Sequence, residues 1–206
     1  MNRQKLVFAT GNANKTREFR EILDQSCYEV LSMKDAGIEL DIEENGSTFV
    51  ENALIKARAV AARTAAIVVA DDSGLVVDAL GGEPGIYSAR YLGEDTPYAV
   101  KNQMILDQLS EVPKEKRTAR FVCAMAAVLP DGQEWTVTGV MEGYIGPEAV
   151  GEHGFGYDPI FYVDAYGTST ANIQPEQKNA ISHRGQALRV IRDKLEDYAR
   201  RGDTGE

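Results

Sequence analysis

The stretch AIVVADDSGLVVDAL, residues 66–80, places two neighbouring carboxylates, Asp71 and Asp72, inside an apolar segment. The apolar runs on either side, residues 66–70 and 74–80, are typical of buried strands, so we predict two strands with the acidic pair at a strand end. Neighbouring side chains on a strand point to opposite faces, so one aspartate is expected to do chemistry and the other to support it. The alternative is a solvated turn, because Asp-Ser-Gly favours turns.

Length and charge restrict the class of protein. A chain of 206 residues suits one domain or two closely joined lobes. The net charge of −10 argues against nucleic acid as a partner, because that attraction comes from clustered Lys and Arg. The run AAIVVA beside the acidic pair is far shorter than the roughly 20 apolar residues of a membrane span, so no membrane partner is expected.

The start of the chain and the cysteine content indicate the compartment. The apolar part of MNRQKLVFATGN is too short for a secretory signal. Cys27 and Cys123 are the two cysteines of the sequence, too few for a disulfide framework. We therefore expect a cytoplasmic protein with two ordinary thiols.

Strand and helix patterns alternate in the first half of the chain. Residues 5–9 form a β-like run, and KTREFREIL, residues 15–23, has helical spacing. A second helix is predicted over 46–64, where Thr48 and Glu51 form a capping box.

The second half adds antiparallel strands and three helices. Thr96-Pro97 is predicted to cap and open a helix that runs to about Leu109. Residues 118–129 and 134–145 are β-rich and are joined by the turn sequence Pro-Asp-Gly, which predicts a hairpin. Helical patterns over 175–182 and 184–201 close the chain. The result is an α/β fold with a mixed sheet.

Four further polar clusters accompany the acidic pair: ATGNANK (9–15), EENG (43–46), GFGYDPIF (154–161) and KNAISHRG (178–185). Each has a structural explanation of its own, as a helix cap, a carboxylate at a helix N-terminus, a core plug or a solvated helix end. Together they supply hard oxygen ligands, lysines for phosphate and an aromatic surface for a base. That combination favours a Mg²⁺-dependent phosphoryl site.

Five ordered blocks carry a resemblance to a known family: FATGNANKTREFREIL, ENGSTFVENALIKA, ADDSGLVVDALGGEPGIYSARY, GFGYDPIFY and EQKNAISHRGQAL. In this order they closely resemble the inosine triphosphate pyrophosphatase family. The resemblance implies a long central mixed sheet flanked by helices, with two lobes and a nucleotide cleft between them. It also implies a Mg²⁺-dependent homodimer. We expect one two-lobed domain over residues 1–199, followed by a disordered tail over 200–206.

The resemblance further implies the reaction and the residues. Water attacks the α-phosphorus of ITP, dITP or XTP, which yields the monophosphate and pyrophosphate. Glu44 and Asp72 are expected at Mg²⁺, and Asp72 is expected to accept the proton of the water. The expected substrate contacts are Thr10, Gly11, Asn12, Ala13, Asn14, Lys15, Ser73, Phe155, Gly156, Tyr157, Asp158, Lys178, His183 and Arg184.

These residues have distinct expected roles. Residues 10–15 and Lys178 would meet phosphate, and His183 with Arg184 would read the purine edge. Two alternatives stay open: a Maf-like nucleotide pyrophosphatase with another base specificity, and a nucleotide sensor without turnover.

Overall fold

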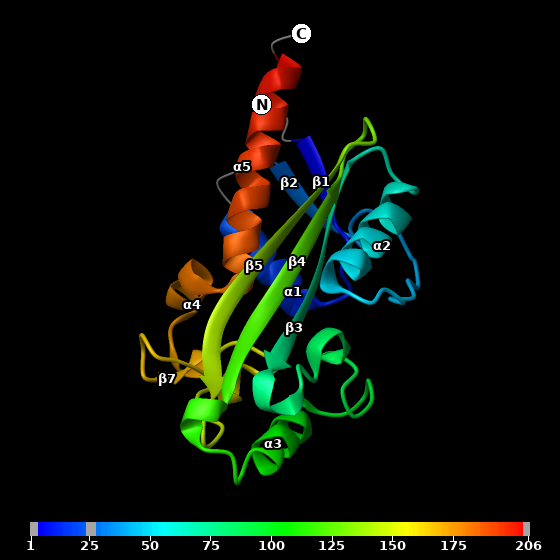
Figure 1. The fold of residues 1–206 in the computed structure, drawn as a ribbon. Coiled ribbons are helices and arrows are strands. Elements are labelled where there is room, and N and C mark those ends of the chain that lie inside the picture. The colour runs from blue at the N-terminus through cyan, green and yellow to red at the C-terminus, as the bar shows by residue number, and fades with distance from the viewer. Residues whose placement is uncertain (1–3, 24–27, 204–206) are drawn as a thin grey trace. The chain divides into compact units, whose positions relative to one another are not determined.

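The computed structural model describes residues 4–23 and 28–203, and it confirms the α/β class (Figure 1). Within these residues a seven-stranded sheet has the order β2-β1-β3-β4-β5-β6-β7. Strand β1 is parallel to β2 and β3, whereas β6 is antiparallel to β5 and β7, so the predicted mixed sheet is confirmed. Cys27 lies outside the described residues.

The bounds of the elements agree with most of the predicted segments. The strands are β1 (Gln4–Phe8), β2 (Tyr28–Ser32), β3 (Ile67–Val77), β4 (Thr118–Val128), β5 (Glu134–Ile145), β6 (Phe161–Val163) and β7 (Thr168–Ser169). The helices are α1 (Ala13–Leu23), α2 (Phe49–Ala61), α3 (Tyr98–Gln108), α4 (Pro175–Ile181) and α5 (His183–Asp203). None of the described helices is long and apolar enough to cross a membrane.

The chain divides into two compact units. Unit 1 comprises Met1–Asp72, Cys123–Gly139 and Arg184–Glu206, and unit 2 comprises Ser73–Val122 and Val140–His183. The predicted site residues therefore fall into two groups, one in each unit. The cleft between lobes stays a prediction.

In unit 1 the two faces of the sheet are covered by different helices. Phe8, Ile67 and Val69 pack in one core cluster with side chains of α1 and α5. Their neighbours along the strands, such as Val68 and Ala70, pack in a second cluster with α2. This alternation follows from the two-residue period of a strand, and it decides which helix each residue of β3 meets.

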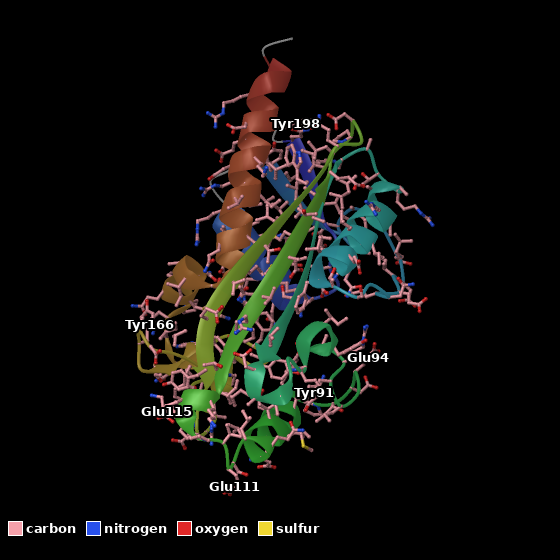
Figure 2. The ribbon with its side chains drawn as sticks, viewed as in Figure 1. Tyr91, Glu94, Glu111, Glu115, Tyr166 and Tyr198 are labelled. Carbon is pink, nitrogen blue, oxygen red and sulfur yellow. The ribbon has the colours of Figure 1, made fainter. Side chains whose placement is uncertain are left out.

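The core of unit 2 contains apolar side chains from its helix and its strands. Ile105 and Leu109 of α3 pack with Leu75 of β3 and with Tyr157 and Phe161. Figure 2 shows the side chains around the ribbon, and the labelled Glu94, Glu111 and Glu115 are among the exposed acidic residues of this unit.

Three local predictions were wrong. The acidic pair lies inside the continuous strand β3 and not at a strand end, because buried cations compensate both carboxylates. Thr96 does not cap α3; its hydroxyl donates to the Leu92 carbonyl, and Pro97 occupies the cap position. Helix α5 continues to Asp203, so residues 200–203 are helical and only 204–206 of the predicted tail lie outside the described residues.

Candidate active site

Asp71 points to the face of β3 that carries α1 and α5. Its side chain is 0% exposed, and its Oδ2 lies 2.9 Å from Lys15 Nζ and 3.6 Å from Arg184 Nε. Arg184 also forms a buried ion pair with Glu18 of α1. Two carboxylates and two cations thus form one buried cluster in unit 1, which satisfies charges that would otherwise be costly to bury.

The pKa values of Asp71 and Arg184 favour the ionised form of both groups. Burial alone would raise the pKa of Asp71, but the charges of Lys15, Arg184 and Lys56 outweigh it and hold the pKa well below its usual range. Burial likewise opposes the charge of Arg184, yet Glu18 and Asp71 raise the pKa of its guanidinium. An aspartate held permanently ionised is a poor proton acceptor, so Asp71 suits the supporting role.

Asp72 points to the opposite face, toward α2. Asn52 Nδ2 donates to Asp72 Oδ2 at 3.1 Å, and Lys56 Nζ lies 3.8 Å from Asp72 Oδ1. The same ammonium lies 3.1 Å from Glu44 Oε1. Burial raises the pKa of Asp72; Lys56 opposes this shift and Glu44 adds to it. Asp72 is therefore the member of the pair better suited to accept a proton.

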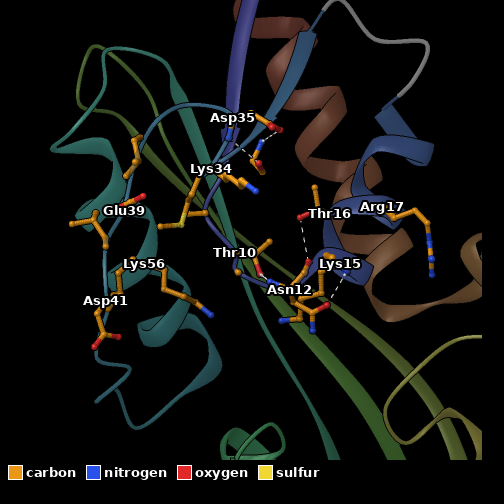
Figure 3. Close-up of a pocket in the computed structure, with 18 of the residues that line it drawn as sticks. Thr10, Asn12, Lys15, Thr16, Arg17, Lys34, Asp35, Glu39, Asp41 and Lys56 are labelled. Carbon is orange, nitrogen blue, oxygen red and sulfur yellow. Dashed lines mark hydrogen bonds between the residues drawn. The ribbon is translucent and has the colours of Figure 1, made fainter.

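These side chains open onto a cavity of about 1230 Å³ in unit 1 (Figure 3). Seven predicted site residues line it: Thr10, Gly11, Asn12, Ala13, Lys15, Glu44 and Asp72. Lys56 also lines it and was not among the predicted site residues. Its signal was the i, i+4 spacing from Asn52 on α2, which places both side chains on the face toward Asp72.

The loop before α1 is folded as a helix cap. Asn12 Oδ1 accepts from the backbone N–H groups of Asn14 at 3.0 Å and Lys15 at 3.3 Å. Thr10 Oγ1 accepts from the N–H of Asn12. The structural explanation of ATGNANK is thus confirmed, and the phosphate contact of residues 10–15 stays a prediction.

In unit 2 the segment 154–158 is organised around Asp158. Its carboxylate accepts from Lys178 Nζ at 2.6 Å, from the N–H of Phe155 at 2.8 Å and from Thr170 Oγ1 at 2.8 Å. The Lys178 ammonium also lies 5.2 Å from the centroid of the Phe155 ring. Asp158, Lys178 and Phe155, all predicted site residues, therefore do lie together.

The remaining predicted residues are placed as follows. Tyr157 is buried and its hydroxyl donates to the Ser88 carbonyl at 2.8 Å. His183 stacks on Phe121, with ring centroids 4.9 Å apart. Ser73 is half-buried at the start of the unit 2 part of β3. Arg184, predicted to read the purine edge, is 3% exposed and paired with Glu18 and Asp71.

The carboxylates near Lys56 fit a cation that is bound jointly with a ligand. Among residues 4–23 and 28–203, no group of three or more His, Cys, Asp or Glu side chains could hold a metal ion by itself. Glu44 and Asp72 offer two carboxylates in one cavity. Mg²⁺ typically uses one or two carboxylates and completes its shell with water and substrate phosphates, so the donor set fits it.

Comparison with known proteins identifies the family of this chain. Residues 6–194 match the Ham1 family. The chain belongs to the Ham1 family. Its relatives include the dITP/XTP pyrophosphatase of Bacillus cereus, 46% identical over 96% of this chain and 97% of the relative, and that of Bacillus subtilis, 47% identical over 94% and 98%. The family predicted from the sequence is thereby confirmed.

Solved structures of similar proteins share the fold. The Ham1 protein of Staphylococcus aureus superposes with a TM-score of 0.84 at 40% identity and covers 95% of this chain and 100% of its own. The nucleoside-triphosphatase (dITP/XTP pyrophosphatase) of Mycobacterium abscessus superposes with a TM-score of 0.73 at 41% identity, over 91% and 98%.

Proposed function

We propose that this chain hydrolyses deaminated purine nucleoside triphosphates, namely ITP, dITP and XTP, to the monophosphate and pyrophosphate. The observation that carries the proposal is the Asp72–Lys56–Glu44 group in the cavity of unit 1, in a chain that matches dITP/XTP pyrophosphatases over nearly its whole length. Such an enzyme removes damaged nucleotides from the pool that polymerases use.

The proposed reaction is attack of water on the α-phosphorus. A bond forms between the water oxygen and the α-phosphorus, and the bond from this phosphorus to the bridging oxygen breaks, so that pyrophosphate leaves. Asp72 accepts a proton from the water. Lys15 and Lys56 lie in the same cavity and offset the negative charge of the triphosphate.

Mg²⁺ is the cofactor that we propose for this reaction. Glu44 and Asp72 would hold it, and when bound it supplies positive charge against the triphosphate. Before Mg²⁺ binds, the ammonium of Lys56 supplies the positive charge that keeps the two carboxylates close together.

The nucleoside would contact residues of unit 2. Phe155 offers a ring for stacking, Asp158 fixes the backbone of its own segment, and Lys178 shares the Asp158 carboxylate. His183 is the group proposed to read the purine edge. Arg184 is buried in its ion pairs and supports Asp71, so we do not propose a direct contact between Arg184 and the base.

The proposal includes the setting of the enzyme. We propose a cytoplasmic homodimer that needs neither nucleic acid nor a membrane. Light scattering coupled to gel filtration measures the assembly, and a monomer mass at micromolar concentration would contradict the dimer.

A pyrophosphate-release assay over ITP, dITP, XTP and the four standard ribonucleotides, with Mg²⁺ and with EDTA, tests the function. The proposal predicts release from the three deaminated substrates and loss of release with EDTA. Preferred hydrolysis of a pyrimidine nucleotide would favour the Maf-like alternative. Tight nucleotide binding without release would favour the sensor.

A further inference from the structure

Helix α3 of unit 2 carries two consecutive polar residues that are buried although neither belongs to the predicted site. Lys101 is 1% exposed and Asn102 is 5% exposed. Lysine is almost never fully buried unless its ammonium has a partner. Burial of both side chains therefore requires specific acceptors and donors, and these lie on two loops.

Asn102 holds the segment 154–158 directly. Its Nδ2 donates to the carbonyl of Gly156 at 3.1 Å. Gly156 has a φ of +68°, a conformation that favours glycine, and a Cβ built at this position would lie 3.6 Å from the ring of Tyr98 on α3. The carbonyl of Gly156 is thus held by the hydrogen bond from Asn102, and the positive φ restricts this position to glycine.

Lys101 holds a second loop, residues 85–91. Its Nζ donates to the Ala89 carbonyl at 2.6 Å and lies 5.0 Å from the centroid of the Tyr98 ring. The carbonyl of the preceding residue, Ser88, accepts from the hydroxyl of Tyr157. Lys101 therefore acts on Tyr157 through one intervening peptide unit.

The contacts of Asn102 and of Lys101 therefore act on two adjacent residues, Gly156 and Tyr157. Tyr98 packs edge-on against Tyr157, with ring centroids 5.2 Å apart at 89°. The end of the second loop is also tied to α3, because the hydroxyl of Tyr91, labelled in Figure 2, donates to Gln108 Oε1 at 3.1 Å. Residues 98, 101, 102 and 105 recur at helical spacing, so one face of α3 supplies the contacts and its core packing.

We infer that Lys101 and Asn102 are positioning residues for nucleotide binding, which hold Gly156 and Tyr157 in the conformation that receives the nucleoside. We call the contacts of Lys101 with residues 85–91 and of Asn102 with residues 154–158 the brace. The identity of the ligand rests on the proposed function, whereas the existence of the brace rests on these contacts of α3 alone. Because Thr10–Lys15 and Lys56, most of the residues proposed to meet the polyphosphate, belong to unit 1 and only Lys178 belongs to unit 2, loss of the brace weakens nucleoside binding more than polyphosphate binding.

The test compares Lys101→Met and Asn102→Ala with the control Gln103→Ala. Gln103 is an exposed residue of α3 whose side chain donates to Asp107 on the same helix. We expect each brace variant to raise the KM for ITP by about tenfold with kcat within about threefold, while the Kd for inorganic tripolyphosphate changes by less than about threefold. Hydrogen exchange of amides in 85–91 and 154–158 should accelerate in the brace variants and not in the control.

Tyr157→Phe keeps the ring and removes the donor to Ser88, so it tests the Lys101 route if Lys101→Met does not fold. It should raise the KM for ITP as Lys101→Met does. In the double variant Lys101→Met/Tyr157→Phe the rise in KM should be smaller than the product of the two single rises, because both substitutions break the same chain of contacts. Lys101→Arg, which retains a donor, should recover part of the loss.

Two results would overturn the inference. One is an unchanged KM together with unchanged exchange in both loops. The other is equal weakening of ITP and tripolyphosphate binding with faster exchange throughout unit 2, which indicates a purely structural role. If the wild-type protein releases no pyrophosphate from any nucleotide, the proposed function fails, and the exchange comparison still decides whether the brace exists.

Discussion

The two units build their parts of the candidate site from different kinds of structure. In unit 1 the acidic pair lies on strand β3, and its partners Lys15 and Lys56 come from helices on opposite faces of the sheet. In unit 2 the site segment 154–158 is a loop, and its backbone is held by the side chain of its own Asp158 and by Asn102 of α3. In unit 1, therefore, the regular geometry of a strand and two helices positions the charged side chains. In unit 2 individual hydrogen bonds position the backbone of a loop.

The largest expected effect is on stability and comes from Arg184. Arg184→Met leaves Glu18 and Asp71 with less compensation for their buried charges, so the free energy of unfolding should fall by roughly 3–5 kcal/mol. Urea unfolding measures it. The control Arg58→Met breaks an exposed pair with Glu134 and should cost less than about 1 kcal/mol. Normal stability with altered ITP-to-ATP selectivity would instead assign Arg184 to the purine edge.

The next effect concerns catalysis in unit 1. Asp72→Asn should lower kcat for ITP by at least about 100-fold, because an amide cannot accept the proton and loses the negative charge, while the fold survives. Asp41→Asn, on the wall of the same cavity, should stay within about threefold of wild type. Near-normal turnover of Asp72→Asn would remove Asp72 from the reaction.

Unit 2 should respond through binding. Thr170→Val removes one of the donors to the Asp158 carboxylate, which costs about 2 kcal/mol and should raise the KM for ITP more than it lowers kcat. Thr118→Val removes the same kind of bond, to Asp78, at an exposed position and serves as the control. A fall in kcat with unchanged KM would show that unit 2 contributes to the chemical step.

The smallest expected effect concerns Lys56, which was not among the predicted site residues. Lys56→Met should lower kcat/KM by about tenfold, because two carboxylates then face each other without their shared ammonium. Lys34→Met, which also lines the cavity, is the control and should have little effect. Equal loss in both variants would mean that Lys56 adds only general positive charge.

Periodicity explains why most elements could be predicted. Residues 5–9, 118–129 and 134–145 were predicted as strands and correspond closely to β1, β4 and β5, because their apolar patterns reflect burial. The Thr48 cap was also correct, since its hydroxyl accepts from the N–H of Glu51. Short strands such as β6 have too few residues to show a period.

The errors arose where distant partners decide the structure. Two adjacent carboxylates normally end a strand, and nothing in residues 66–80 shows that Lys15 and Arg184 will compensate one of them. Lys56 was missed for the same reason, because a lysine on a helix is usually solvated and its distant carboxylate partners do not show in the local sequence. The candidate carboxylates could be found from local sequence, whereas the cations that make them tolerable could not.

The most direct test of the central claim is hydrolysis of ITP by the wild-type protein in H₂¹⁸O with Mg²⁺, followed by mass spectrometry of both products. Attack of water on the α-phosphorus predicts one ¹⁸O in the phosphate of IMP and none in pyrophosphate. Label in pyrophosphate, release of orthophosphate as the first product, or absence of hydrolysis would contradict the account.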